Sequence, residues 1–428
     1  MEIEKIKKII ITQKEETEDF FKNEKIIQRD LNLEKLKKFL KYPNIFVISG
    51  VRRSGKSTLA LQLLENKKYG CLNFDDERLA GFTENDFDKV LQGMYELFGD
   101  LDYFIFDEIQ NIKNWELFAN RLRRTKRIII TGSNASLLSG ELSTRLTGRY
   151  IDFTLYPFSF KEFLAYKGAE FKKEDFYSTK KISQIKRHLS EYIKIGGFPE
   201  VYKFGGIIAG KIFNDIISKD ILLRYGIKNQ STFKELSNYL ISNFSKEMGY
   251  AKLANIFSIK DAHTAKNYVS YLHLTYMIFI LEKFSFKLKQ KAIAPKKIYG
   301  IDTGLINSLA FQFSENKGRL MENIVLLDFL REKSYNNNNS EIYYWQDYDG
   351  REVDFVVKSG RKIIQLIQVC ANLDEFQTKE REIKSLLKAS DELRCNNLMV
   401  ITHDYESEEK IENKKVKFVS LWKWLLRV

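Results

Sequence analysis

The residues best suited to chemistry form a glycine-rich segment, Gly50-Val-Arg-Arg-Ser-Gly-Lys-Ser57, directly after an apolar run at 45–49. The pattern GxxxxGK[ST] between a strand and a helix lets backbone N–H groups curl around phosphate oxygens. Lys56 can reach the β- and γ-phosphates of a nucleotide, and the Ser57 hydroxyl is a hard oxygen ligand suited to Mg²⁺. The flanking strand and helix argue against an ordinary glycine-rich turn. The predicted phosphate-binding residues are Gly50, Val51, Arg52, Arg53, Ser54, Gly55, Lys56, Ser57 and Thr58.

A second apolar run, at 103–106, ends in the carboxylates Asp107 and Glu108. In a parallel sheet the carboxyl ends of the strands face the ligand crevice, so we expect both side chains near the phosphate loop. Asp107 would hold the magnesium shell, and Glu108 would orient or deprotonate the attacking water. A strand that ends in surface acids is common in isolation, but the position downstream of the loop favours the catalytic interpretation.

A third apolar run, at 127–130, leads to Ser133 and Asn134, either of which could hold the water against the γ-phosphate. Arg145 and Arg149 follow, on either side of a glycine and just before another apolar strand. One of them could stabilise transition-state charge on its own nucleotide or on that of a neighbouring chain, with a slight preference for Arg145. The alternative is that these arginines simply pair with surface acids.

The order of these features resembles that of the AAA-type P-loop ATPases: a phosphate loop, an Asp-Glu strand, a Ser/Asn strand and then arginines. The resemblance covers residues 25–165. It implies a five-stranded parallel sheet flanked by helices, ATP as the nucleotide, and assembly in rings or pairs, so that a homo-oligomer is among the expected partners. Beyond residue 165 the sequence offers no second arginine-bearing sensor helix, which argues against a ring.

The composition favours a globular chain with several domains. Its 428 residues are 44% hydrophobic and carry a net charge of +13, which suggests a polyanionic partner or merely a lysine-rich surface. The three scattered cysteines form no disulfide framework, and no His/Cys cluster has zinc spacing. The N-terminus lacks a signal-peptide core, and no apolar stretch reaches membrane-spanning length without a charge. We therefore expect a cytoplasmic protein without a membrane partner.

The middle of the chain predicts a winged helix, a variant of the helix-turn-helix. Its lysines concentrate between Lys228 and Lys291, where ten lysines stand against four acids. The expected elements are a helix from 231, a short helix at 251–257, a recognition helix at 261–274, and wing strands at 277–284 and 285–291. The preceding segment, 166–228, is expected to be a helical linker or lid with a sharp turn at Gly196-Gly197.

Double-stranded DNA is the expected polyanion. Lysines on the recognition helix and wing would contact phosphates and give affinity without sequence choice, and only Asn267 could read a base. We therefore expect weak sequence preference; the alternative is a winged helix that contacts protein. The predicted DNA contacts are Lys260, His263, Lys266, Asn267, Lys287 and Lys289, with Lys291 further along the wing.

The C-terminal part, 292–428, resembles the core of restriction-endonuclease-like (PD-(D/E)XK) nucleases in its order of helix, three strands, helix and strand. In that family a helix glutamate, a strand aspartate and an acidic-x-lysine pair form the site; here the matching residues are Glu322, Asp354, Gln368 and Cys370. Gln368 supplies only a neutral oxygen to a metal, and Cys370 is uncharged, soft and short. We therefore predict a degenerate nuclease site that serves as a scaffold or docking surface.

The whole chain thus resembles prokaryotic, especially archaeal, ATPases that join an AAA-type motor, a winged helix and a nuclease-like domain in one α/β multidomain protein. The leading hypothesis is a Mg²⁺-dependent ATPase whose nucleotide state repositions a DNA-binding module. The alternatives are an ATP-gated switch with slow hydrolysis and protein partners, and an active DNA nuclease. The predicted domains are an N-terminal segment (1–24), the ATPase domain (25–165), the linker or lid (166–228), the winged helix (229–291) and the nuclease-like domain (292–428).

Overall fold

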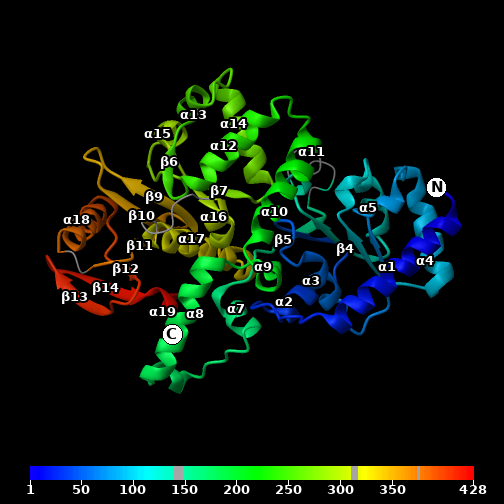
Figure 1. Cartoon of the computed structure of the whole chain (residues 1–428), viewed down its shortest axis with the longest axis horizontal. Coiled ribbons are helices and arrows are strands. Elements are labelled where there is room, and N and C mark those ends of the chain that lie inside the picture. Colours follow the sequence, from blue (N-terminus) through cyan, green and yellow to red (C-terminus); the bar gives the residue numbers. More distant parts are fainter. Residues whose placement is uncertain (139–145, 147, 310–316, 374–375) are drawn as a thin grey trace. The chain divides into compact units, whose positions relative to one another are not determined.

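The computed structural model describes residues 1–138, 146, 148–309, 317–373 and 376–428. The chain divides into two compact units. Unit 1 comprises 1–156 and 274–276, and unit 2 comprises 157–273 and 277–428. Unit 1 is drawn mainly in blue and cyan in Figure 1, and unit 2 from green to red.

Unit 1 is built on a five-stranded sheet in the order β2-β3-β4-β1-β5, with every neighbouring pair parallel. The interior strand β1 is buried along its whole length, which is why its sequence IFVIS is apolar on both faces, whereas the edge strand β2 alternates between buried and half-buried residues. This arrangement confirms the predicted parallel P-loop sheet. The strands are β1 (Ile45–Ser49), β2 (Tyr69–Asn73), β3 (Tyr103–Asp107), β4 (Arg127–Gly132) and β5 (Tyr150–Thr154).

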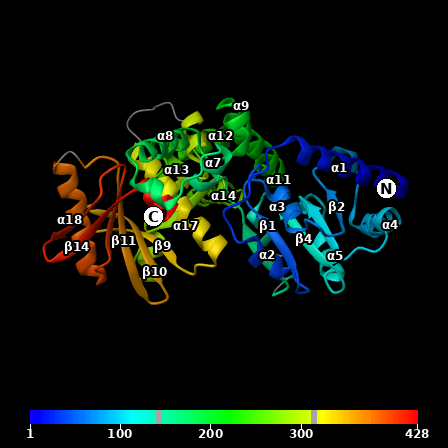
Figure 2. The same ribbon diagram turned by 90° about the horizontal axis from the view of Figure 1, so that it is seen from below.

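Helices cover both faces of this sheet (Figure 2). Helices α4 and α5 pack together, with the rings of Phe87 and Phe118 stacked 4.1 Å apart between their centroids. The step from β1 to β2 crosses the sheet in the opposite direction to the steps from β2 to β3 and from β3 to β4. Because each crossover is right-handed, α3 lies on the face opposite to α4 and α5. The helices are α1 (Ile3–Asn23), α2 (Leu33–Phe39), α3 (Lys56–Leu63), α4 (Phe87–Phe98) and α5 (Trp115–Leu122).

The N-terminal segment, predicted at 1–24 ahead of the ATPase domain, contributes to the core of unit 1. Helix α1 buries Ile6, Ile9 and Ile10 in the same cluster as residues of α4 and the sheet. Gln13, on the same face, locks the end of β2: its Nε2 donates to Asn73 O (3.1 Å), and its Oε1 accepts from Asn73 N (2.9 Å). The amide thus satisfies a backbone position at a strand end.

Unit 2 opens with helices and a three-stranded antiparallel sheet in the order β6-β8-β7. The second wing strand was predicted at 285–291 and this is wrong: those residues lead into helix α15, and the third strand is β8. The elements are α7 (Phe160–Tyr166), α8 (Thr179–Ile195), α9 (Pro199–Phe204), α10 (Ile207–Asp215), a π-helical turn (Ile216–Leu222), α11 (Leu223–Tyr225), α12 (Gln230–Ser242), β6 (Lys246–Met248), α13 (Tyr250–Ile256), α14 (Ala262–Leu274), β7 (Ile278–Glu282), α15 (Leu288–Ile293), β8 (Lys296–Gly300) and α16 (Thr303–Leu309).

The glycine turn after α8 accommodates a buried carboxylate. A Cβ on Gly196, whose φ is +77°, would lie 2.1 Å from Asp302 Oδ1. Asp302 Oδ2 accepts from Gly197 N (2.5 Å), and Oδ1 accepts from Leu305 N (2.9 Å). Burial raises the pKa of Asp302 to about 6.

The C-terminal part of unit 2 holds a six-stranded mixed sheet in the order β13-β14-β12-β11-β10-β9. Its buried face includes Trp345, Val356 and Phe418 and packs against α18. The elements are α17 (Lys317–Asn336), β9 (Glu341–Gln346), β10 (Glu352–Ser359), β11 (Lys362–Cys370), α18 (Phe376–Leu393), β12 (Leu398–Thr402), β13 (Ser407–Ile411), β14 (Lys414–Ser420) and α19 (Leu421–Leu426).

Candidate functional site

The glycine-rich segment between β1 and α3 adopts backbone conformations that turn N–H groups toward one centre. Gly50, Arg53 and Gly55 have φ values of +143°, +67° and +92°. A Cβ on Gly50 would lie 2.2 Å from the carbonyl oxygen of Leu155, so only glycine fits beside the residue that follows β5. The alternation of left- and right-handed residues is the geometry of an anion-binding backbone nest.

Lys56 and Ser57 are the first two residues of α3, so both stand at the positive end of the helix dipole. The ammonium of Lys56 is buried, donates to Val51 O (3.1 Å), and lies 3.6 Å from Glu108 Oε1. The Ser57 hydroxyl donates to Asp107 Oδ2 at 2.7 Å. The structure therefore brings together the four residues expected to carry hydrolysis.

Thr131, at the end of β4, joins the two carboxylates and was missed by the sequence interpretation. Its hydroxyl donates to Asp107 Oδ1 and accepts from the backbone N–H of Glu108 (3.2 Å). Glu108 has a φ of +50°, and its Oε2 accepts from Gln110 Nε2 and from Ser133 N (3.2 Å). The backbone N–H of Ser133 thus helps to fix the orientation of the glutamate.

The two adjacent carboxylates differ in acidity. Burial, with the neighbouring Glu108 charge, raises the pKa of Asp107. Burial acts in the same direction on Glu108, but the Lys56 ammonium, the Arg52 charge and the hydrogen bonds from Gln110 and Ser133 together outweigh it, and the pKa of Glu108 is lowered. Glu108 is therefore ionised near neutral pH, as a group that accepts a proton must be.

A buried arginine supports the glycine-rich segment from behind, and no pattern in the sequence indicated it. Arg29 donates from Nη1 to Ser54 O (2.9 Å) and from Nη2 to Tyr156 O (2.6 Å). It therefore ties the loop to the chain that leaves β5. Because these bonds span 25 and 127 residues, only the fold reveals them.

The other residues predicted around the γ-phosphate lie at different places in the structure. Asn134 is fully buried directly after Ser133, whereas Arg149 precedes β5 at the amino end of the sheet and donates to Asn120 Oδ1 (3.4 Å). The phosphate loop follows the carboxyl end of β1, so Arg149 lies at the opposite edge of the sheet from it. Arg145 lies outside the described residues.

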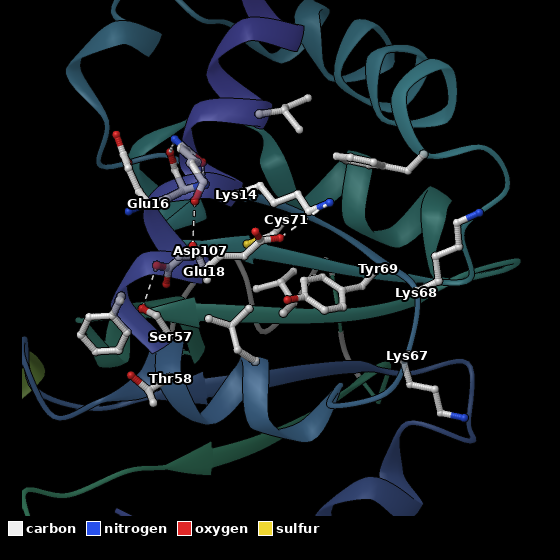
Figure 3. Close-up of a pocket in the computed structure, with 18 residues that line it drawn as sticks. Lys14, Glu16, Glu18, Ser57, Thr58, Lys67, Lys68, Tyr69, Cys71 and Asp107 are labelled. Carbon is white, nitrogen blue, oxygen red and sulfur yellow. Dashed lines mark hydrogen bonds and ion pairs between the residues drawn. The ribbon is translucent and has the colours of Figure 1, made fainter. Parts of the chain in front are cut away.

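A cavity of about 600 Å³ adjoins the site (Figure 3). It is enclosed by residues of α1, α3 and β2, and Ser57, Thr58 and Asp107 form its polar end. Figure 3 shows the Ser57–Asp107 hydrogen bond at this end and Tyr69 and Cys71 along β2. Residues 50–56 do not line it, so it is a separate space behind the metal-type ligands rather than the phosphate cradle.

The chemistry of the site suits a nucleoside triphosphate and Mg²⁺. The buried hydroxyl of Ser54, within the loop, has no hydrogen-bond partner among the described residues, so a donor is available to a phosphate oxygen. Ser57 and Asp107 offer the hard oxygens that Mg²⁺ prefers. The residues present therefore fit the expected cofactor.

The predicted DNA contacts of unit 2 lie on two elements. Lys260, His263 and Lys266 are exposed at the start of α14, and Asn267 is half-buried, with its Nδ2 3.4 Å from His263 Nδ1. Lys287 and Lys289 are exposed at the beginning of α15, so they do not alternate along a wing strand as expected. Lys291, on the same helix, pairs with Glu282 (2.9 Å).

The four residues of the predicted degenerate nuclease site converge from α17, β10 and β11. Gln368 Oε1 accepts from Asp354 N (3.2 Å), while Glu322 and Cys370 line the same cavity of about 710 Å³. A fifth residue, Lys297 of β8, lies among them and was missed because it precedes Glu322 by 25 residues. Burial would lower the pKa of Lys297, but Glu322 and its other anionic neighbours outweigh this, and the pKa is raised well above its usual range.

Comparisons with known proteins match three segments of the chain. An AAA domain model matches residues 42–164, and two domains of unknown function match 186–316 (DUF8612) and 317–424 (DUF4143). The chain is 36% identical to the uncharacterized protein MJ1544 of Methanocaldococcus jannaschii, over 95% of this chain and 92% of that protein. It is 30% identical to an uncharacterized protein of Haemophilus influenzae, over 93% and 98%.

The chain therefore carries an AAA-type, ATP-binding P-loop domain of α/β fold. It belongs to the family of MJ1544. Among solved structures, it is similar to the Walker-type ATPase PABY2304 of Pyrococcus abyssi, with 13% identity, coverage of 66% of this chain and 96% of that chain, and a TM-score of 0.38. Within the described residues, no helix has the length and hydropathy needed to span a membrane.

Proposed function

We propose that this protein is a Mg²⁺-dependent ATPase whose nucleotide state controls a DNA-binding module in unit 2. The observation that carries the proposal is the constellation of Lys56, Ser57, Asp107 and Glu108 around one buried point at the carboxyl edge of a parallel sheet. Each of these side chains has the chemistry that one step of phosphoryl transfer needs.

The roles follow from the positions of the side chains. The backbone from Gly50 to Ser57 would bind the phosphates, with Lys56 adding positive charge. Ser57 and Asp107 would hold Mg²⁺, which neutralises developing charge on the phosphates when bound. Glu108 would accept the proton of the attacking water, and the buried Asn134 would orient that water.

Arg149 is proposed to act only on a neighbouring molecule. Its place at the amino edge of the sheet does not support contact with the nucleotide of its own chain. A finger role would therefore require a homo-oligomer in which one chain completes the site of the next.

The DNA-binding part of the proposal rests on charge and topology. The order α12, β6, α13, α14, β7, β8 with an antiparallel three-stranded sheet supports a winged helix, and lysines are exposed at the start of its third helix. Lysine contacts to phosphates would give binding to double-stranded DNA with weak sequence preference.

The three cysteines are free thiols, in keeping with the expected cytoplasmic location.

A second candidate, an ATP-gated switch with slow hydrolysis and protein partners, is favoured by one observation. Glu108 accepts from Gln110 and Ser133 and lies beside Lys56, and its lowered pKa makes it a weaker base. Turnover should then be slow and indifferent to DNA.

Measuring ATP turnover with and without duplex DNA, at about 50 and 200 mM salt, separates the two candidates. The first predicts DNA-stimulated turnover that weakens at the higher salt concentration and is lost in the double variant Lys260→Glu/Lys266→Glu. A matched control, Lys180→Glu/Lys388→Glu, makes the same charge change at exposed lysines of α8 and α18. Turnover unaffected by DNA, salt and both double variants would contradict the DNA-controlled ATPase and support the switch.

A further inference from the structure

Lys297 is a buried lysine enclosed by three carboxylates. Its Nζ lies 2.9 Å from Glu322 Oε1, 3.2 Å from Asp354 Oδ1 and 2.5 Å from Glu352 Oε1. The side chain is 3% exposed, and the three acids come from α17 and β10. An ammonium has three N–H donors, so these contacts use all of them.

Two of the carboxylates also accept hydrogen bonds from groups other than Lys297. Tyr299 donates its hydroxyl hydrogen to Glu322 Oε1 (2.6 Å), and Val369 N donates to Asp354 Oδ2 (2.9 Å). These bonds come from β8 and β11, the strands on either side of the cluster. The ion cluster is therefore part of the packing of the domain rather than a mobile surface pair.

The residues that would complete a nuclease metal site are committed elsewhere. Gln368 accepts from Asp354 N through Oε1 and donates to Glu382 through Nε2, so the protein itself fixes both ends of its amide. The Cys370 thiol donates to Asn372 O (3.1 Å). With the Lys297 ammonium in place, the residues that the structure describes present no group of three His, Cys, Asp or Glu side chains that could hold a metal ion.

We propose that the Lys297 ammonium is a built-in cation that takes the place of a divalent metal ion among Glu322, Glu352 and Asp354. The nucleases that this domain resembles use a divalent cation. Such an ion does not fit among these three carboxylates, because the Lys297 ammonium fills its position. Lys297 is also not a displaced catalytic lysine, since none of its N–H groups is left to contact a phosphate or a water. The domain thus keeps a nuclease-like carboxylate cluster but holds it together without metal.

This inference predicts what happens when the ammonium is removed. Three carboxylates left together without a counter-charge repel one another and are costly to bury, so the domain should then depend on an added divalent cation. The test compares the full-length wild type with Lys297→Met in EDTA and in Mn²⁺, by thermal unfolding and by Mn²⁺ binding followed with electron paramagnetic resonance. Any Mn²⁺ bound by the phosphate-loop site is common to both chains and cancels in the comparison.

In EDTA the melting temperature of Lys297→Met should fall by roughly 10 °C or more, and Mn²⁺ should restore at least half of the loss. Lys297→Met should also bind one more Mn²⁺ ion than the wild type. The matched control is Lys296→Met, which removes the adjacent buried lysine of β8; its Nζ donates to Lys291 O (2.6 Å) and pairs with a single carboxylate, that of Glu282 (3.6 Å). This control should bind no additional Mn²⁺ and should not respond to it.

Equal stability of Lys297→Met and wild type in EDTA, without additional Mn²⁺ binding, would overturn the proposal. If Lys297→Met does not fold under either condition, the quadruple variant Lys297→Met/Glu322→Gln/Glu352→Gln/Asp354→Asn decides. A folded quadruple variant that ignores Mn²⁺ supports the proposal, because removing the three negative charges then removes the need for the ammonium. An unfolded quadruple variant counts against it, since the lysine would then be needed for its shape and not for its charge.

Discussion

The Ser57 hydroxyl donates a 2.7 Å hydrogen bond to Asp107 Oδ2, joining the first turn of α3 to the end of β3. The two residues are 50 positions apart in sequence, yet together they present the pair of oxygens that a magnesium ion needs beside a phosphate loop. Thr131 holds the other oxygen of Asp107, so the carboxylate is fixed from both sides.

Replacing Thr131 with Val should weaken the binding of Mg²⁺ at the site. The substitution keeps the shape of the side chain but removes the donor to Asp107 and the acceptor for Glu108 N. Losing a hydrogen bond to a buried carboxylate costs about 1–3 kcal/mol, so we expect the Mg²⁺ concentration for half-maximal ATP binding to rise about tenfold. A titration of Mg²⁺ with a fluorescent ATP analogue measures it. Thr131→Ser keeps the hydroxyl and should behave like wild type; if both variants do, the hydroxyl has no such role.

Arg29→Met should impair nucleotide binding although Arg29 need not touch the nucleotide. Without the guanidinium, the carbonyls of Ser54 and Tyr156 lose buried partners and the phosphate loop loses its support. We expect ATP affinity to fall at least about tenfold, as measured by calorimetry. The control is Arg123→Met, because Arg123 also donates to a backbone carbonyl, that of Pro43 (2.9 Å), but at an exposed site. Equal affinities for the two variants would show that Arg29 does not support the loop.

Stability should depend on pH through Asp302. Its pKa is raised to about 6 from 3.8, so the protonated form is favoured on folding. The stabilising contribution is therefore complete below about pH 4 and is lost as the pH rises through about 6, and two pH units correspond to roughly 3 kcal/mol. Wild type should lose stability relative to Asp302→Asn between pH 4 and 7, as followed by denaturation with tryptophan fluorescence. A difference between the two chains that is constant with pH would refute the assignment.

Supercoiled plasmid should remain intact when incubated with the wild-type chain and Mg²⁺ or Mn²⁺. The expectation follows because the Lys297 ammonium fills the position of a metal ion among the carboxylates. The amide of Gln368 is also hydrogen-bonded to Asp354 N and to Glu382. Gel electrophoresis over several hours measures nicking. A metal-dependent cut that disappears in Asp354→Ala would show that the nuclease-like site is active and would contradict the account of Lys297.

The phosphate site could be predicted from sequence because its residues lie in short local patterns. Gly50 to Ser57 form one contiguous motif, and Asp107 and Glu108 end an apolar strand, so periodicity alone places them at one sheet edge. Arg29, Gln13 and Thr131 could not be found this way, because each acts through partners 23 to 127 residues away.

The errors in unit 2 have physical causes too. Residues 285–289 alternate polar and apolar side chains as a strand would, but they lead into α15, and the strand that pairs with β7 is β8. Lys297 was overlooked because a lysine in a short apolar strand resembles a surface residue until its three carboxylate partners are seen.

The most direct test of the central claim is a comparison of wild type with Glu108→Gln, measuring MgATP binding by calorimetry and turnover by phosphate release. We predict that the variant binds ATP as the wild type does, because Glu108 does not belong to the phosphate loop, and that its turnover falls by at least about 100-fold, because the proton acceptor is gone. The control, Glu116→Gln, changes a buried glutamate of α5 and should retain turnover. Absence of MgATP binding by the wild type, or unchanged turnover in Glu108→Gln, would contradict the account.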